Sequence, residues 1–178
     1  MKAQIVCGAN FGDEGKGLTT NFLASQVGNA IVVRFNGGAQ AGHTVEVNGL
    51  RHVFHHFGSG TLVGKPTYLS AYFVVDPLTF IEEREQLVQK GIHPRVFIDT
   101  RAPLTTPYDA MINMELERAR GDSRHGSCGY GVGETIERNT NAPQYQTHVA
   151  DIFCSRESLK ELLIRIRDEY VPYRLAQL

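Results

Sequence analysis

A glycine-rich segment near the N-terminus, Gly12–Gly17, has the residue types of an anion-binding loop. It follows the short apolar run Gln4–Cys7, which predicts a strand, and it precedes a helical pattern over residues 18–27. Glycines let backbone N–H groups approach an anion closely, and a helix N-terminus and Lys16 add positive charge. We therefore expect a phosphate cradle, in which the Asp13 carboxylate can bind Mg²⁺ or abstract a proton.

This anion-binding interpretation has a structural alternative. A Walker A loop needs Ser or Thr directly after its lysine, and the chain has Gly17 at that place. A glycine-rich turn between a strand and a helix is also a common structural device. The carboxylate of Asp13 within the turn favours the ligand-binding interpretation.

A second glycine-rich segment, Gly37–Thr44, follows the apolar run at residues 30–35, which predicts a strand buried on both faces. Loops that leave parallel strands at one edge of a sheet face a shared crevice, where α/β proteins bind ligands. His43 in this segment is a candidate general acid, and a structural histidine is the alternative. The two glycine-rich loops are thus expected to form one site.

The remaining sequence supplies the elements that would position these loops. Asn48 and Gly49 predict the turn of a β-hairpin. Three histidines near this turn, His52, His55 and His56, indicate either a metal site or packing of the hairpin, and we favour packing.

Capping residues and periodicity predict the further elements. We expect a strand at residues 95–99 and helices that begin after Asp76, Thr106 and Ser155 and end at Gly91, Gly121 and Pro172. Residues 121–146 are expected to be the stretch of the chain that is richest in loop. This order predicts an α/β fold with a largely parallel sheet flanked by helices, a P-loop-like nucleotide-binding architecture and a β-hairpin.

The composition, with 42% hydrophobic and 21% charged residues, fits one compact domain over residues 1–178. A net charge of −1 gives no positive field for nucleic acid or an anionic membrane, and no apolar run approaches the roughly 20 residues of a membrane span. Three separated cysteines, without a CxxC pair, are typical of a reducing compartment. We therefore expect a cytoplasmic protein with small-molecule partners.

Two motifs in combination resemble the N-terminal signature of the adenylosuccinate synthetase family. They are GDEGKG at Gly12–Gly17 and GG-x-x-AGHT at Gly37–Thr44. His55–Gly60 is similar to a histidine-then-SG turn of the family, and Gly126–Gly133 is a degraded version of its TTGRGIGP loop. The resemblance covers roughly residues 4–138.

The resemblance implies a magnesium-dependent ligase of purine biosynthesis, which forms adenylosuccinate, GDP and phosphate from GTP, IMP and L-aspartate. Asp13 would take the proton from purine N1 so that O6 attacks the γ-phosphate, and His43 would donate a hydrogen bond or proton to that oxygen. Mg²⁺ would be held by the Asp13 carboxylate and the Gly42 carbonyl.

The resemblance also implies two sets of binding residues. Those for GTP are Gly12, Asp13, Glu14, Gly15, Lys16, Gly17, Leu18, Gly42, His43 and Thr44. Those for an IMP-like nucleotide are Asp13, Glu14, Gly15, Lys16, Gln40, Ala41, Gly42, His43 and Cys128.

The chain departs from the family pattern in the loops expected to bind IMP. Gln40 replaces an asparagine that contacts IMP, and Cys128 replaces a threonine on its phosphate, which exchanges a good donor for a weak one. Tyr130 and Glu134 replace a basic residue and a proline. These changes leave open a variant synthetase for another purine nucleotide such as dGMP, although Asp13 argues for a hypoxanthine base.

The family's aspartate-binding loop and guanine-recognition segment lie beyond the matched region. We therefore expect residues 1–178 to be a single nucleotide-binding domain, the N-terminal part of a longer synthetase that is a homodimer when complete. A non-catalytic purine-nucleotide-binding module is the alternative. Arg138 is a candidate for a residue donated across such a dimer.

Overall fold

The computed structural model describes residues 2–10 and 12–177. The strands are β1 (Val32–Gly37), β2 (His43–Val47), β3 (Leu50–Phe54), β4 (Thr67–Phe73) and β5 (Val96–Ile98). The longer helices are α1 (Lys16–Ser25), α2 (Pro77–Gln89), α3 (Pro107–Ala119), α4 (Val132–Asn141) and α5 (Arg156–Arg165), and a short α6 (Val171–Leu175) follows.

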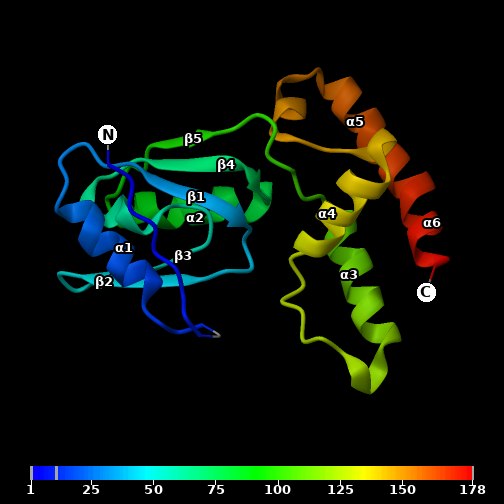
Figure 1. The fold of residues 1–178 in the computed structure, drawn as a ribbon. Coiled ribbons are helices and arrows are strands. Elements are labelled where there is room, and N and C mark those ends of the chain that lie inside the picture. Colours follow the sequence, from blue (N-terminus) through cyan, green and yellow to red (C-terminus); the bar gives the residue numbers. More distant parts are fainter. Residues whose placement is uncertain (1, 11, 178) are drawn as a thin grey trace.

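The sheet contains three parallel strands in the order β1-β4-β5. Helix α2 lies behind it in Figure 1, and the antiparallel hairpin β2–β3 lies apart from it, close to α1. Helices α3 to α6 form a group beside the strands (Figure 1). The expected α/β class, with a parallel sheet and a separate hairpin, is confirmed.

Local sequence signals explain several element boundaries. The Asp76 carboxylate accepts the N–H groups of Leu78 and Thr79, at 3.0 and 3.1 Å, and so caps α2 as expected. In the hairpin, Asn48 and Gly49 both have positive φ, at 53° and 76°, as a two-residue turn of this kind requires. These two predictions are confirmed.

One expected strand is absent and two elements were missed. The segment Gln4–Cys7 forms no strand in the described part of the chain, because none of the described strands pairs with it. The loop-rich stretch at residues 121–146 contains α4, which was not predicted and whose sequence VGETIERNTN carries few large apolar side chains. The strand β4, at the centre of the sheet, was not predicted at all.

The C-terminal helix also differs from its prediction. Ser155 caps α5 by accepting the N–H of Ser158 at 3.1 Å, as expected. Pro172 does not end the helix, because a π-helical turn at Ile166–Tyr170 precedes it and places the proline in the first turn of α6. The proline has no N–H to donate, and the altered hydrogen-bond spacing of the π-helical turn just before it lets the helix continue.

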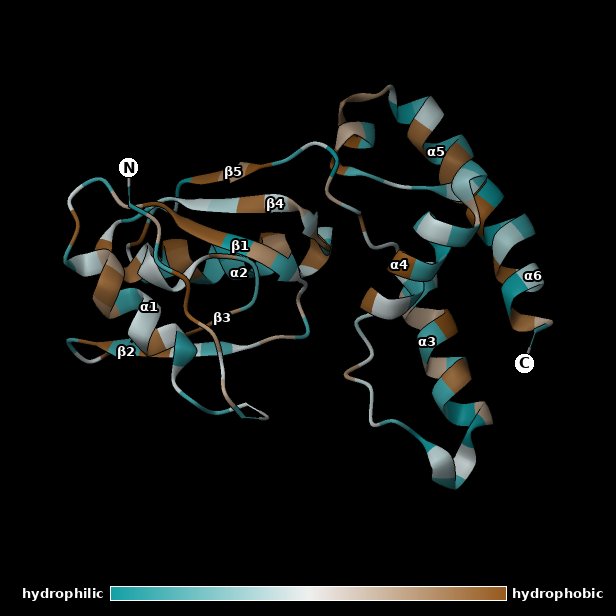
Figure 2. Ribbon diagram, viewed as in Figure 1, coloured by the Kyte–Doolittle hydropathy of each residue, from teal (hydrophilic) through white to brown (hydrophobic). Residues whose placement is uncertain are grey.

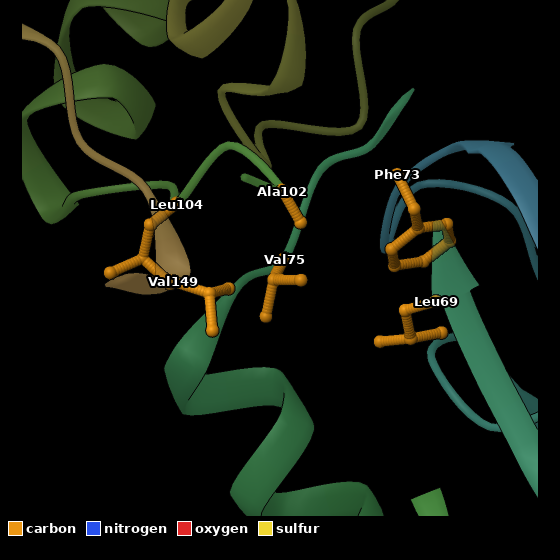
Figure 3. Packing of buried hydrophobic residues seen from close by; sticks show 6 residues of the cluster. All are labelled: Leu69, Phe73, Val75, Ala102, Leu104 and Val149. Carbon is orange, nitrogen blue, oxygen red and sulfur yellow. The ribbon is translucent and has the colours of Figure 1, made fainter. Parts of the chain in front are cut away.

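Three clusters of buried apolar side chains stabilise the fold. The cluster in Figure 3 joins the sheet to the helical group and contains Leu69, Phe73, Val75, Ala102, Leu104 and Val149. A second cluster packs the hairpin against α2, and a third lies among α3 to α6. Within the described residues, no helix combines the length and the apolar character needed to span a membrane.

Candidate functional site

The first glycine-rich loop leads directly into α1. Gly15 adopts a left-handed conformation at the N-cap, with φ 75°, and Lys16 is the first residue of the helix. Asp13 also has a positive φ of 56°, which is uncommon for a residue other than glycine and exposes its carboxylate at the turn. A strained, exposed carboxylate beside a helix N-terminus is compatible with binding a cation or a substrate proton.

Glu14 folds back across this loop. Its carboxylate is ion-paired with Lys16 and accepts the N–H of Asn10 at 2.7 Å. The hydrogen bonds from Lys16 and Asn10 lower the pKa of Glu14. The ammonium group expected to bind phosphate is therefore already paired with a carboxylate, which sequence reasoning did not anticipate.

Helix α1 brings the first loop against the second. A Cβ atom on Gly17 would lie 3.0 Å from His43 Cβ and 3.3 Å from Ser59 Oγ, so a larger residue there would push the two segments apart by a few tenths of an ångström. His43 begins β2. The structure thus brings together the start of α1 and the histidine of the second loop, as expected for a common site.

His43 is half-buried in a positively charged environment. Burial, followed by the charges of Arg34, Lys16 and His55, lowers its pKa from 6.5 to about 4. The imidazole is therefore neutral near pH 7. A neutral imidazole carries one N–H donor and one acceptor nitrogen.

The second loop is packed firmly against the core. A Cβ atom on Gly38 would lie 3.0 Å from the Val74 carbonyl oxygen and 3.1 Å from Val132 Cγ2, and Ala39 is fully buried. The Nδ1–H of His55 donates to the Ala39 carbonyl oxygen at 2.7 Å. Helix α4 and the hairpin therefore both hold this loop.

A buried carboxylate on α2 fixes the backbone that carries His55. Glu83 accepts the backbone N–H groups of His55, His56 and Phe57 at 3.1, 2.6 and 3.3 Å. The imidazoles of His52 and His56 each place a nitrogen 3.6 Å from a Glu83 oxygen. Burial alone would raise the pKa of Glu83, but these imidazole and backbone groups lower it to about 2.

The tautomers of these two histidines follow from their other partners. His56 Nε2 accepts the N–H of Asp76 at 3.0 Å, and His52 Nδ1 faces the Lys90 ammonium at 3.0 Å. The protons are therefore on the nitrogens that face Glu83. This arrangement matches the packing interpretation of the hairpin histidines, with a carboxylate at its centre that the sequence did not reveal.

Arg34 is a second charged residue that sequence reasoning missed. It lies in the apolar strand β1, is 9% exposed, and its guanidinium is 4.9 Å from the centre of the Phe73 ring. Burial lowers its pKa to about 10, opposed by the charge of Glu83. A lone arginine inside an apolar strand was the available signal, because such a charge is rarely buried without a role.

The third motif, Gly126–Gly133, follows α3 and runs into the first two residues of α4. Its backbone N–H groups at Gly126 and Ser127 donate to Glu117 at 2.9 and 3.2 Å. The Tyr130 ring is centred 6.3 Å from that of His55, so this loop reaches the hairpin side of the site. Cys128, expected on a nucleotide phosphate, is exposed.

The expected binding residues differ in exposure. Eight of them are exposed: Gly12, Asp13, Gly15, Leu18, Gln40, Gly42, Thr44 and Cys128. Glu14, Lys16, Ala41 and His43 are half-buried, and Gly17 is buried. A site with this many exposed members is open to solvent.

The structure corrects the expectation for Arg138. Its side chain is fully buried in α4 and makes two hydrogen bonds to Asp109, at 2.8 and 2.7 Å, and one to the Tyr145 carbonyl at 2.6 Å. A guanidinium that is buried and paired in this way cannot reach another subunit. Arg138 instead joins α3 to α4.

A cavity of about 290 Å³ lies between the hairpin and α2. Its lining includes His52, His55, Glu83, Lys90 and Tyr130. Among the described residues, no group of three or more His, Cys, Asp or Glu side chains could hold a metal ion. The expected magnesium ligands, the Asp13 carboxylate and the Gly42 carbonyl, are instead hard oxygen donors of the kind that Mg²⁺ binds together with water and substrate phosphates.

Comparisons with known proteins identify relatives over almost the whole chain. The adenylosuccinate synthetase family model matches residues 5–173. An adenylosuccinate synthetase of Clostridium botulinum (strain Eklund 17B / Type B) is 37% identical over 96% of this chain and 40% of its own, and that of Borrelia turicatae is 38% identical over 75% and 31%. The chain therefore spans about 40% or less of the length of these relatives.

Two solved structures share the fold. A fully ligated adenylosuccinate synthetase from Plasmodium falciparum aligns with a TM-score of 0.77 and 24% identity, over 96% of this chain and 40% of that one. A cyanophage S-2L succinoaminodeoxyadenylate synthetase, bound to dGMP and dATP, aligns with a TM-score of 0.63 and 20% identity, over 90% and 41%. With the family match over residues 5–173, the chain belongs to the adenylosuccinate synthetase family.

Proposed function

We propose that this chain forms the nucleotide-binding part of an enzyme that ligates L-aspartate to IMP at the expense of GTP. Membership of the family supports the reaction class. The observation that carries the proposal for this chain is the contact between Gly17 and His43, which joins the phosphate-type loop to the histidine of the second loop. In this proposal residues 1–178 act as one nucleotide-binding unit of a larger catalytic assembly.

The first loop binds the phosphates of GTP. Backbone N–H groups at the start of α1 and the Lys16 ammonium supply the positive charge. Polyphosphate must compete with Glu14 for that ammonium, so binding is coupled to release of the Lys16–Glu14 ion pair. Mg²⁺, held by Asp13 and the Gly42 carbonyl, supplies charge neutralisation for the phosphates when it is bound.

Asp13 acts as the base toward the purine. Its carboxylate accepts the N1 proton, and the resulting ring anion makes O6 a competent nucleophile toward the γ-phosphate, with GDP as the leaving group. The amine of aspartate then displaces the phosphate from C6. Exposure of Asp13 at the turn leaves its carboxylate accessible to a bound base.

His43 acts as a hydrogen-bond donor to the reacting oxygen. A pKa of about 4 means that the imidazole is neutral at pH 7, so an N–H group rather than an imidazolium proton faces O6. A preoriented donor aimed at developing charge stabilises a transition state without titrating. The structure thus favours the hydrogen-bond role among the two that the family resemblance allows.

The remaining properties of the complete enzyme are part of the same proposal. We infer magnesium dependence, a cytoplasmic location and a homodimer. The L-aspartate site and the guanine site belong to the part of the relatives that this chain does not span. A variant with dGMP as substrate is the second candidate, because Gln40 and Cys128 replace residues that contact IMP in the family.

The test compares the isolated chain with an assembly that contains the missing part of the fold. We expect the isolated chain to bind GTP or IMP by calorimetry but to form no adenylosuccinate from IMP, GTP and aspartate. A chimera in which this chain replaces the matched region of the Clostridium botulinum relative should form the product, detected by absorbance and mass. Product only from dGMP would select the second candidate, and failure of the isolated chain to bind any purine nucleotide would contradict both.

A further inference from the structure

Arg34 is a buried cation in a hydrophobic part of the sheet. The first part of β1 is hydrophobic in Figure 2, and Arg34, the third residue of this strand, is only 9% exposed. Its guanidinium lies over the Phe73 ring, 4.9 Å from the ring centre. Its Nη1 atom is buried and has no hydrogen-bond partner among the described residues. A buried charge without such a partner destabilises a fold, because its lost hydration is not replaced.

No carboxylate in the described part of the chain is ion-paired with Arg34. The charge of Glu83 acts on the guanidinium and opposes the lowering of its pKa by burial. The oxygens of Glu83, however, accept three backbone N–H groups and lie 3.6 Å from two imidazole nitrogens. The buried face of α1 consists of Gly17, Asn21 and Ala24 and offers no acid. The guanidinium therefore lacks a counter-ion in the unliganded chain.

A second buried arginine shows what a structural role requires. Arg138 is fully buried, and it donates to the carboxylate of Asp109 at 2.8 and 2.7 Å and to the carbonyl oxygens of Tyr145 and Leu104 at 2.6 and 3.3 Å. Its charge and its N–H donors are thus satisfied within the chain. Arg34 has no comparable set of partners, so contacts within this chain do not account for its charge.

The position of Arg34 relates it to the helix that begins at the first glycine-rich loop. Because side chains alternate along a strand, Arg34 shares its face of β1 with Val32. A Cβ atom on Gly60 would lie 2.8 Å from Val32 Cγ2 and 3.0 Å from Ala24 Cβ of α1. Helix α1 therefore packs over the face of β1 to which Arg34 belongs.

The phosphate-type loop lies within reach of this buried charge. Gly17, in the first turn of α1, packs against His43. Of the charged groups that lower the pKa of His43, Arg34 has the largest effect and Lys16 the next. A charge inside a protein acts over several ångströms and is screened by salt less than a surface charge is. An anion bound at the start of α1 would therefore be attracted by Arg34.

We propose that Arg34 supplies charge to the phosphate site of the first loop, and that the oxyanion of a bound polyphosphate is the counter-ion that its guanidinium lacks. This inference deepens the proposed function and rests on it, because it requires phosphate to bind at that loop. The two cations of the site then differ in availability. Lys16 must separate from Glu14 before it binds phosphate, whereas Arg34 has no partner to release.

The first measurement is the affinity of the chain for inorganic tripolyphosphate by calorimetry. Arg34→Met keeps an apolar side chain against Phe73 but removes the charge, so affinity should fall by about tenfold. Arg34→Lys keeps the charge and should stay within about threefold of the unsubstituted chain. The control Arg95→Met removes an exposed cation just before β5, where the strands of the sheet begin, and should change affinity by less than about threefold.

The second measurement is the thermal stability of the unliganded variants, and it separates a charge held for a ligand from a structural charge. Arg34→Met should leave the melting temperature unchanged or raise it by up to roughly 5 °C, because a buried charge without a counter-ion is removed. Arg138→Met should lower it by more than about 5 °C, because Asp109 would remain buried and unpaired. A loss of affinity without a loss of stability is the signature of a ligand-directed charge.

Three results would overturn the proposal. The first is an unchanged tripolyphosphate affinity in Arg34→Met while Lys16→Ala is weakened, which would leave the proposed function standing. The second is a melting temperature of Arg34→Met more than about 5 °C below that of the unsubstituted chain, or a variant that does not fold, which would make the charge structural. The third is an equal loss of affinity in Arg34→Lys and Arg34→Met. Failure of the unsubstituted chain to bind tripolyphosphate or GTP would contradict the proposed function and this inference together.

Discussion

The two glycine-rich loops differ in how much of the molecule holds them. The second loop follows β1, a paired strand, and its Gly38 and Ala39 are packed against the core and tied to His55. The first loop follows Gln4–Cys7, which no described strand pairs with, and its internal contacts are made by Glu14. The second loop is therefore preorganised, whereas the first depends on its own carboxylate until a ligand replaces it.

The two loops therefore have different tasks, because the second loop is held in position and the first carries the charged groups. Glu83 accepts the backbone N–H of His55, and the His55 imidazole in turn donates to the Ala39 carbonyl of the second loop. The first loop carries Lys16 and Asp13, the groups assigned to phosphate and proton transfer. Substitutions in the first loop should therefore change affinity or chemistry with little effect on stability, whereas substitutions in the second should change stability as well.

The largest expected effect is on turnover of the chimera. Asp13→Asn keeps the size of the side chain but removes the base, so kcat should fall by roughly two to four orders of magnitude while nucleotide binding persists. His43→Asn should lower kcat similarly. Single-turnover assays with IMP, GTP and aspartate, with calorimetry for binding, measure both quantities, and an Asp13→Asn variant that retains most activity would refute the assigned base.

The sequence predicted those elements of the fold that are fixed by contacts between residues close together in the chain. Asp76, Ser155 and the Asn48-Gly49 turn act within a few residues, and their elements were predicted. The strand β4 forms between two strands from distant segments of the chain, and α4 was missed because its amphipathic sequence has few large apolar side chains. Short-range signals therefore gave the hairpin and the capped helices, but not the centre of the sheet.

The site shows the same limit. The motifs indicated which loops would meet, and the contact of Gly17 with His43 is consistent with that. The pairing of Lys16 with Glu14, two residues away, depends on how the loop is folded, and the burial of Glu83 depends on backbone groups 26 to 28 residues away along the chain. Spacing along the chain holds no information on such contacts. The roles of the individual binding residues stay predictions.

The second-largest expected effect, after the loss of turnover, is on the affinity of the first loop for phosphate. Lys16→Ala should weaken GTP binding by at least roughly tenfold, because it removes a charge-assisted contact. Glu14→Gln should act in the opposite direction on inorganic tripolyphosphate, since it removes the carboxylate that competes for the ammonium. Calorimetry with Lys65→Ala, a lysine bound instead to the Gly28 carbonyl, provides the matched control. Unchanged affinity in Lys16→Ala would leave the first loop a structural turn.

A pair of glycine substitutions compares Gly38 of the second loop with Gly8, which lies against Glu14 of the first loop. Gly38→Ala places a methyl group 3.0 Å from the Val74 carbonyl oxygen, so the free energy of unfolding should fall by about 1–3 kcal/mol. Gly8→Ala meets only the flexible carboxylate of Glu14, at 2.6 Å, and should change that free energy by less than about 0.5 kcal/mol. Urea unfolding followed by circular dichroism measures both, and equal losses would mean that the two loops are held alike.

The smallest expected effect is a shift in the pKa of His43. This shift measures how strongly the charge of Lys16 in the first loop acts on the histidine of the second loop. Burial, then Arg34 and Lys16, lower its pKa from 6.5 to about 4. Because the unfolded chain binds this proton at higher pH, the contribution of His43 to stability is complete above about pH 6.5 and is lost as the pH falls toward 4.

Removing the Lys16 charge by Lys16→Ala should raise the pKa of His43, and Lys65→Ala should not. Histidine Cε1 proton shifts, assigned with His43→Asn, follow the titration by NMR, and a midpoint near 6.5 in the unsubstituted chain would show that the second loop does not bury its histidine.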